Sequence, residues 1–366
     1  MTASFVGYAK FAETVAQIGF FSTIIFCFIF ISLTIFGVKR NFGSYKNLLI
    51  LFSAVGIVFA TIELILYPNG YSHNAGFIFY TASRPFNMSK EATTWLLSFY
   101  AGVYASTMSM LAVQFVYRYW AIFHETKLRF FKGWKFLFCI LYCAYFGIEW
   151  AIGLYYLDYI DDYAKNYFKQ EMLDRYDTDI SEISGMSLVA YDENGGVRWL
   201  NVSCTLHMTF IMMVQYSVVI YCTVFMYRKM EEKLKLLSSS LRSLHKQFFK
   251  TLILQISTPT ITLFLPVVFL IYCPLLDFQT DLPTGISNCA LTIYPAMDAI
   301  IVMYVVQDYR KAMKSNKLTV SSEKGTFLGI LKKYVDQLHK WLATSNDNTK
   351  SSTKSRVAKA PAVLNN

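Results

Sequence analysis

Long apolar blocks separated by polar loops dominate the pattern along this chain. Each block has about 20 residues or more, the length that a helix needs to cross the ~30 Å hydrocarbon core of a bilayer. The blocks lie at about 15–38, 47–68, 93–116, 136–157, 206–226, 251–273 and 284–306. The pattern therefore predicts an all-α membrane protein, a bundle of seven transmembrane helices over 15–306, preceded by residues 1–14 and followed by a tail over 307–366.

Basic residues concentrate in every second loop and predict the orientation. The loop between the fifth and sixth blocks holds seven basic residues (Arg228, Lys229, Lys233, Lys235, Arg242, Lys246 and Lys250). In contrast, the loop 158–203 carries ten acids and four bases. Because Lys and Arg are enriched in cytoplasmic loops, we expect the N-terminus outside and the C-terminus in the cytoplasm.

The composition narrows the function classes. Charged residues make up 16% of the chain, against about 25% in soluble domains. The net charge of +10 is spread over loops at a membrane surface, so it points to the lipid bilayer as a partner and not to nucleic acid.

The loops and the tail carry further expectations. Residues 187–191 and 197–201 are short apolar runs on either side of Asp-Glu-Asn-Gly-Gly, which predicts a β-hairpin that covers the bundle as a lid, with an irregular acidic loop as the alternative. Segment 327–342 is basic and amphipathic, suited to anionic lipid or to a partner, and the end of the tail reads as disordered. Two sequons, at Asn87 and Asn201, fall in loops expected outside and are candidate glycosylation sites.

No catalytic constellation is recognisable. The five histidines are scattered and form no HExxH, and no Walker A loop or GxSxG elbow is present. We therefore expect no enzyme, no cofactor and no metal. A seven-span channel or a transporter stays open as an alternative, although no internal repeat and no TVGYG filter is found.

Ionisable residues inside spans are expensive and therefore indicate function. Glu63 and Glu149 are placed at similar depth in the outer half of the bilayer, where they could bind a polar group of a ligand; a purely structural carboxyl is the alternative. The remaining ligand-pocket candidates are large side chains in the outer halves of spans: Tyr100, Met208, Met212, Tyr216 and Phe269.

Prolines predict places where spans bend. Pro259 and Pro266 interrupt the sixth span, and Pro295, between Tyr294 and Asp298, interrupts the seventh. Helices that bend at such points can move as levers between two states, although a purely structural kink is the alternative. At the inner end of the third span lies Arg118, which could also simply extend to the interface.

Three stretches together resemble the nematode serpentine chemoreceptors of the Str superfamily, over about residues 15–315. They are 114–122 (QFVYRYWAI), 244–259 (LHKQFFKTLILQISTP), and 294–298 (YPAMD) with 307–310 (QDYR). The resemblance implies an olfactory-type G-protein-coupled receptor for environmental chemicals, in the plasma membrane and in the cilium of sensory neurons.

The resemblance also implies roles for particular residues. Arg118, flanked by Tyr117 and Tyr119, would couple to a heterotrimeric G protein together with Arg242, Lys246 and Lys250. Tyr117 stands where such receptors normally carry an acid, which puts the usual ionic restraint of the inactive state in doubt. No cysteine lies at the outer end of the third span, so the disulfide usual in such receptors cannot form.

Overall fold

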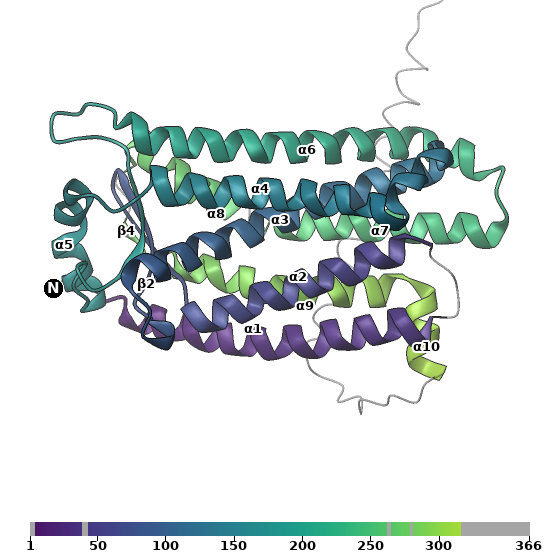
Figure 1. Cartoon of the computed structure of the whole chain (residues 1–366), viewed down its shortest axis with the longest axis horizontal. Helices are drawn as coiled ribbons and strands as arrows, with labels where there is room; N and C mark the ends of the chain where they lie inside the picture. The colour runs from purple at the N-terminus through teal and green to yellow at the C-terminus, as the bar shows by residue number, and fades with distance from the viewer. Residues whose placement is uncertain (1–3, 39–42, 262–264, 279–280, 316–366) are drawn as a thin grey trace, which may run out of the picture. The chain divides into compact units, whose positions relative to one another are not determined.

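The structure is a computed structural model that describes residues 4–38, 43–261, 265–278 and 281–315. Long helices run alongside one another in it (Figure 1). The helices of the bundle are α1 (Val6–Ser32, continued by a π-helical turn at Leu33–Gly37), α2 (Tyr45–Leu66), α3 (Lys90–Phe123), α4 (Phe136–Leu157), α6 (Trp199–Leu234), α7 (Ser239–Pro259), the short α8 (Leu265–Tyr272) and α9 (Gly285–Val305). Each of the seven predicted spans overlaps one of these helices, or the pair α7 and α8.

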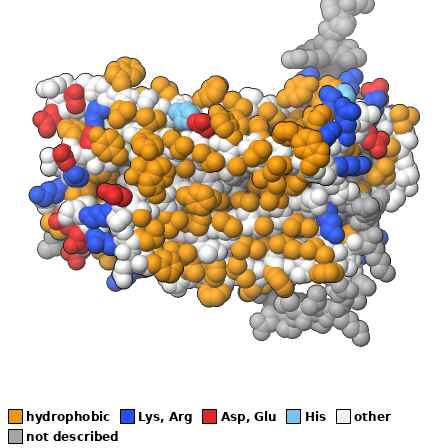
Figure 2. All heavy atoms as spheres, in the orientation of Figure 1, with side chains coloured by type: hydrophobic (Ala, Val, Ile, Leu, Met, Phe, Trp, Pro, Cys, Tyr) orange, Lys and Arg blue, Asp and Glu red, His pale blue; other side chains and the backbone are white. Residues whose placement is uncertain are grey.

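Five of the helices that the structure describes are long and apolar enough to cross a membrane. They are α1 with its π-helical turn, α2, α3, α4 with the 3₁₀ turn before it, and α6. Figure 2 shows hydrophobic side chains over the middle of the visible face and charged ones gathered near its two ends. With 34 and 36 residues, α3 and α6 are ~50 Å long and therefore extend beyond a ~30 Å hydrocarbon core.

Small residues let the helices approach closely. Gly147 of α4 faces α3, and a Cβ added to it would lie 2.0 Å from Ser106 Oγ and 2.8 Å from the carbonyl oxygen of Gly102. Gly56 of α2 likewise faces Pro295 of α9, with 2.8 Å between the added Cβ and the proline Cβ. Because lipid tails supply no hydrophobic drive between helices, such close van der Waals contact is what stabilises their pairing.

A small antiparallel sheet and a short helix lie at one end of the bundle, which we call the sheet end. The strands β1 (Asn69–His73), β2 (Gly76–Thr81), β3 (Ser184–Val189) and β4 (Asp281–Leu282) follow the order β3-β2-β1-β4. Helix α5 (Asp162–Tyr176) packs Phe168 and Met172 against Tyr71 and Ile78 of the sheet, and all four side chains are fully buried. We call the opposite end, which carries Arg118 and α10 (Gln307–Ser315), the arginine end (Figure 1).

The predicted hairpin forms only at its tip. The strand β3 pairs with β2 over six residues, from Gly76 opposite Val189 to Thr81 opposite Ser184. Between the two predicted arms, Tyr191 bridges Val197, and the amides of Asp192 and Arg198 donate to the carbonyl oxygens of Gly196 and Ala190, but α6 already begins at Trp199. The backbone of β2 offers β3 a longer ladder than the second arm could, so most of the first arm pairs with another loop. The predicted tail segment 327–342 lies outside the described residues.

Candidate functional site

Arg118 lies between two aromatic rings inside the arginine end. Its guanidinium carbon is 3.4 Å from the ring centre of Tyr45 on α2 and 3.5 Å from that of Phe248 on α7. The Arg118 residue is only 5% exposed, so the charge is largely withdrawn from water. A cation over a desolvated aromatic face gains about 2 kcal/mol. We call Tyr45, Arg118 and Phe248 the aromatic clamp; it joins α2, α3 and α7.

No carboxylate among the described residues forms an ion pair with Arg118, and its Nε and Nη2 atoms have no hydrogen-bond acceptor there. Tyr117, next to Arg118, packs its ring 4.9 Å from that of Phe131, in the segment between α3 and α4. Its ring also lies 5.1 Å from that of Tyr45. Aromatic contacts thus surround both Tyr117 and Arg118.

Buried hydrogen bonds hold the helices around the aromatic clamp. The Tyr45 hydroxyl donates to Gln114 Oε1 at 3.2 Å, and Gln255 of α7 donates to Asp298 of α9 at 2.8 Å. The Thr34 and Tyr309 hydroxyls are 2.8 Å apart, which ties the end of α1 to α10. These polar contacts join α1, α2, α3, α7, α9 and α10 at this end of the bundle.

The other residues predicted to couple to a G protein have different surroundings. Tyr119 faces away from the clamp and packs edge-on against Phe225 of α6, with 5.3 Å between ring centres. Arg242 donates to the carbonyl oxygens of Leu234 and Lys235, where it caps the end of α6. Lys246 forms an exposed ion pair with Glu231 at 2.5 Å. Lys250 is half-buried on α7.

Two of the prolines predicted to bend spans, Pro259 and Pro266, lie at helix ends, and the third, Pro295, lines a small cavity. Helix α7 ends at Pro259, and α8 begins one residue before Pro266. Tyr294 and Asp298 are both buried. A cavity of about 10 Å³, room for about one water, lies between α2, α3 and α9. Its lining is Phe52, Ser53, Gly56, Phe59, Tyr104, Thr107, Tyr294 and Pro295.

Glu63 and Tyr100 lie together beneath the sheet. Glu63 and Tyr100 are each 2% exposed, and the two side chains interact. The Tyr100 ring stacks on Phe59 at 4.6 Å and lies 6.4 Å from Phe79 of β2. The sheet thus covers a buried carboxyl that lies among aromatic rings.

The remaining ligand-pocket candidates do not join Glu63. Glu149 is 37% exposed on α4 and faces His207 of α6, with 3.6 Å between His207 Nε2 and Glu149 Oε2. Phe269 is exposed, and Tyr216 bonds Thr260 at 3.1 Å. Met208, with Met212 packed beside it, belongs to an apolar cluster between α3, α4 and α6. The sequence predicts a similar depth in the bilayer for Glu63 and Glu149, but it does not predict which face of its helix each carboxyl occupies.

The two sequons differ in access. The Asn201 side chain is buried, and its amide nitrogen donates to the carbonyl oxygens of Leu157 and Ser187 and to the Asp158 carboxylate. A glycan attaches to that same nitrogen, so Asn201 in this fold is closed to modification. Asn87 is exposed in the loop before α3, and we keep the glycosylation prediction for it alone.

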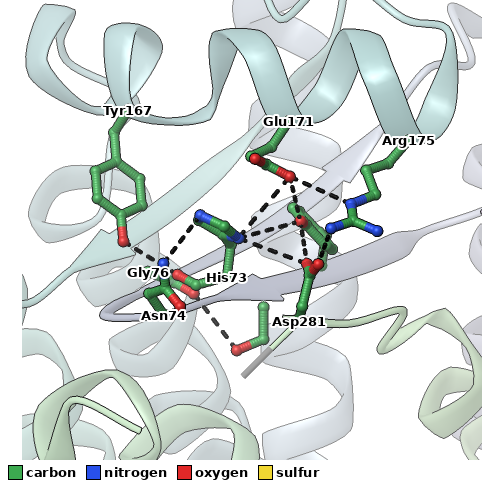
Figure 3. A network of polar contacts seen from close by, with 9 residues as sticks. His73, Asn74, Gly76, Tyr167, Glu171, Arg175 and Asp281 are labelled. Carbon is green, nitrogen blue, oxygen red and sulfur yellow. Dashed lines mark hydrogen bonds and ion pairs between the residues drawn. The ribbon is translucent and has the colours of Figure 1, made fainter. Parts of the chain in front are cut away.

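Two groups of residues were not predicted. Tyr45 and Phe248 of the aromatic clamp are unremarkable in sequence, because only the fold brings them to Arg118. The second group is a polar cluster at the sheet end that contains Tyr71, His73 and Glu171 (Figure 3). A signal for its strands was present, since residues 69–81 contain two β-prone runs around Asn-Ala-Gly.

Comparison with known proteins agrees with this architecture. The family model for the serpentine type 7TM GPCR chemoreceptor Str matches residues 12–314. The chain is 32% identical to G-protein coupled receptor str-33 of Caenorhabditis elegans, over 89% of this chain and 96% of that one. It is 29% identical to serpentine receptor class r-10 of the same nematode, over 75% and 81%.

The fold itself is that of a rhodopsin. Squid rhodopsin superposes with a TM-score of 0.55 over 89% of this chain and 90% of that one, at 13% sequence identity. The family match spans nearly the whole helix bundle, including the aromatic clamp and the covered carboxyl at Glu63. The chain therefore belongs to the Str family of serpentine, seven-transmembrane G-protein-coupled chemoreceptors.

Proposed function

We propose that this receptor binds a small environmental molecule from outside the cell and activates a heterotrimeric G protein inside it. The sheet end faces outward and the arginine end faces the cytoplasm, as the basic loops predict. The plasma membrane of a sensory-neuron cilium is the location that the resemblance implies. The observation that carries the proposal is Arg118, buried in the aromatic clamp between helices from three parts of the chain.

The aromatic clamp is suited to hold a resting state. A G protein binds such a bundle where the cytoplasmic ends of the helices separate. Separation of α7 from α3 would move Phe248 off Arg118 and expose a guanidinium group that is desolvated in the closed form. A ligand drives this change only by binding the open form more tightly than the closed one.

The ligand contacts Glu63 and Tyr100 in this proposal. Both side chains are buried under β2, and the sheet ties together the three loops at this end through the pairs β2–β3, β2–β1 and β1–β4. Opening of these loops would admit a small molecule with one polar group for the carboxyl and an apolar body for the aromatic rings.

A second-messenger assay tests the proposal. Cells that express the chain with a promiscuous G protein are screened with pooled odorants, and Arg118→Ala is compared with Arg129→Ala, an exposed arginine between α3 and α4. We expect a response in the parent chain and in Arg129→Ala, and its loss in Arg118→Ala at equal surface expression.

An odorant-evoked current without G protein would support a ligand-gated channel instead. Substrate accumulation without signalling would support a transporter. Loss of the response in both arginine variants would mean that total basic charge, and not the aromatic clamp, determines coupling.

A further inference from the structure

Three segments that lie far apart in the chain bring a histidine and two carboxylates together at the sheet end. His73 ends β1, Glu171 lies on α5 and Asp281 begins β4. Figure 3 shows their side chains pointing toward one another. One donor atom from each residue lies within 4.8 Å of the other two. The scattered histidines in the sequence predicted no metal site, because this group forms only when three loops meet.

The distances between these donor atoms suit a single metal ion. His73 Nδ1 lies 3.5 Å from Asp281 Oδ1 and 3.9 Å from Glu171 Oε2. Two donors bound to one zinc ion at about 2.1 Å, with tetrahedral angles, are about 3.4 Å apart. The Tyr71 hydroxyl is 3.4 Å from His73 Nδ1, and it donates to Glu171 at 3.1 Å and to Asp281. Small side-chain shifts would thus place three protein donors around one ion, with the Tyr71 hydroxyl next to the fourth position.

Neighbouring residues aim the imidazole ring at the carboxylates. The Tyr167 hydroxyl donates to the His73 carbonyl oxygen at 3.1 Å, and the Asn74 amide lies 3.1 Å from His73 Nε2. When Nδ1 binds a metal, Nε2 carries the ring proton, and the Asn74 amide can turn its oxygen to accept it. Outer partners of this kind orient the histidine ligands of metal sites.

The charge of the cluster also favours a cation. Glu171 and Asp281 contribute two negative charges, and the single guanidinium of Arg175 pairs with both. A metal ion binds the neutral form of the His73 ring, which adds no charge of its own. One negative charge is then left over, and the ligand side chains are 21–34% exposed, open to ions from solution.

We propose that His73, Glu171 and Asp281 form a site for a divalent transition-metal ion such as Zn²⁺, with the Tyr71 hydroxyl next to the fourth position. Imidazole and carboxylate donors together suit this class of ion. The metal would cross-link the three loops of the sheet end above Glu63 and Tyr100. The site does not depend on coupling to a G protein, and its test needs no known odorant.

The test measures Zn²⁺ binding to the full chain in lipid nanodiscs, by competition with a chromophoric chelator, together with thermal unfolding. We expect one saturable site per chain and a rise in melting temperature with Zn²⁺ but not with Mg²⁺. His73→Ala should weaken the affinity at least tenfold. His207→Ala is the matched control, because His207 faces only one carboxylate, that of Glu149, and should bind as the parent chain does.

The Arg175→Gln variant distinguishes a metal site from a cluster that is held by salt bridges alone. Removal of the guanidinium takes away a positive charge, so it should tighten Zn²⁺ binding, and Zn²⁺ should restore the melting temperature that the variant loses. The proposal is overturned if the parent chain shows no saturable binding, if His207→Ala weakens binding as much as His73→Ala, or if Zn²⁺ leaves the melting temperature of Arg175→Gln unchanged.

Discussion

Loss of one face of the aromatic clamp should switch the receptor on without ligand. Phe248→Leu keeps an apolar side chain of similar volume but removes the ring whose centre lies 3.5 Å from the Arg118 guanidinium. A desolvated cation–π contact is worth about 2 kcal/mol, which corresponds to a ~30-fold shift in an equilibrium constant. A receptor that is open about 1% of the time would then be open about 20% of the time.

The assay is ligand-independent second-messenger output per receptor at the cell surface. Phe249→Leu is the matched control, because Phe249 is the next residue on α7 but packs against the apolar cluster between α3 and α6. Tyr45→Phe keeps the ring on the other face but loses the hydroxyl that bonds Gln114 and interacts with Arg118, so it should raise output about fivefold, as expected for ~1 kcal/mol.

Two results would refute the reasoning. Unchanged basal output from Phe248→Leu at equal surface expression would mean that the stacked ring does not stabilise the resting state. An equal rise from Phe249→Leu would mean that looser packing of α7 in general, and not the loss of the cation–π contact, opens the bundle.

Three further predictions concern stability and topology. Burial raises the pKa of Asp158 from 3.8 to about 7. A folded-state pKa above the unfolded one gives stability that is complete below about pH 4 and declines, by at most ~4 kcal/mol, as the pH rises to 7. Thermal unfolding should therefore show a lower melting temperature at pH 8 than at pH 5, and a smaller difference in Asp158→Asn. Gly147→Leu should reduce surface expression and melting temperature, because the new side chain would clash with Ser106 and the Gly102 carbonyl, whereas Ile148→Leu on the exposed face should not. Asn87→Gln should abolish a glycosidase-sensitive gel shift that Asn201→Gln retains; a shift that survives in Asn87→Gln would contradict this assignment.

The helical part of the fold could be predicted because its signal is local. A run of apolar residues long enough to cross a bilayer identifies a span whatever the rest of the chain does. Pro259 likewise coincides with the end of α7, and Pro295 lies inside α9. Local patterns gave no information on rotation about the helix axis, so Glu63 and Glu149 were placed at equal depth but occupy different environments.

The sheet end could not be predicted in full because it forms between loops. The strand β3 follows in part from the β-prone run at 187–191. The partner of β3 is β2, which lies more than one hundred positions earlier, and no local signal specifies that pairing. The same holds for the aromatic clamp, since Tyr45, Arg118 and Phe248 come from three helices, and only Arg118 carries an obvious charge.

Helix α2 suggests how the two ends communicate. Glu63 near one end of α2 contacts Tyr100 beneath the sheet, Gly56 in the middle packs on Pro295, and Tyr45 at the other end stacks on Arg118. Tyr45 and Glu63 are 18 positions apart on continuous helix, which corresponds to ~27 Å. Such a helix moves as a unit, so we infer that a ligand that displaces Glu63 also shifts Tyr45 and weakens the aromatic clamp.

A double-mutant cycle tests this inference, because adjacency alone does not demonstrate coupling. Basal output is measured for Glu63→Gln, Phe248→Leu and the combined variant. A second cycle, with Glu149→Gln in place of Glu63→Gln, is the control. Glu149 lies on α4 and pairs with His207 of α6, so the contact described for it runs to α6 and not to α2. We expect an interaction energy above ~0.5 kcal/mol for the Glu63 pair and additivity for the Glu149 pair. Additivity in both cycles would show that α2 holds the two ends in place without linking them.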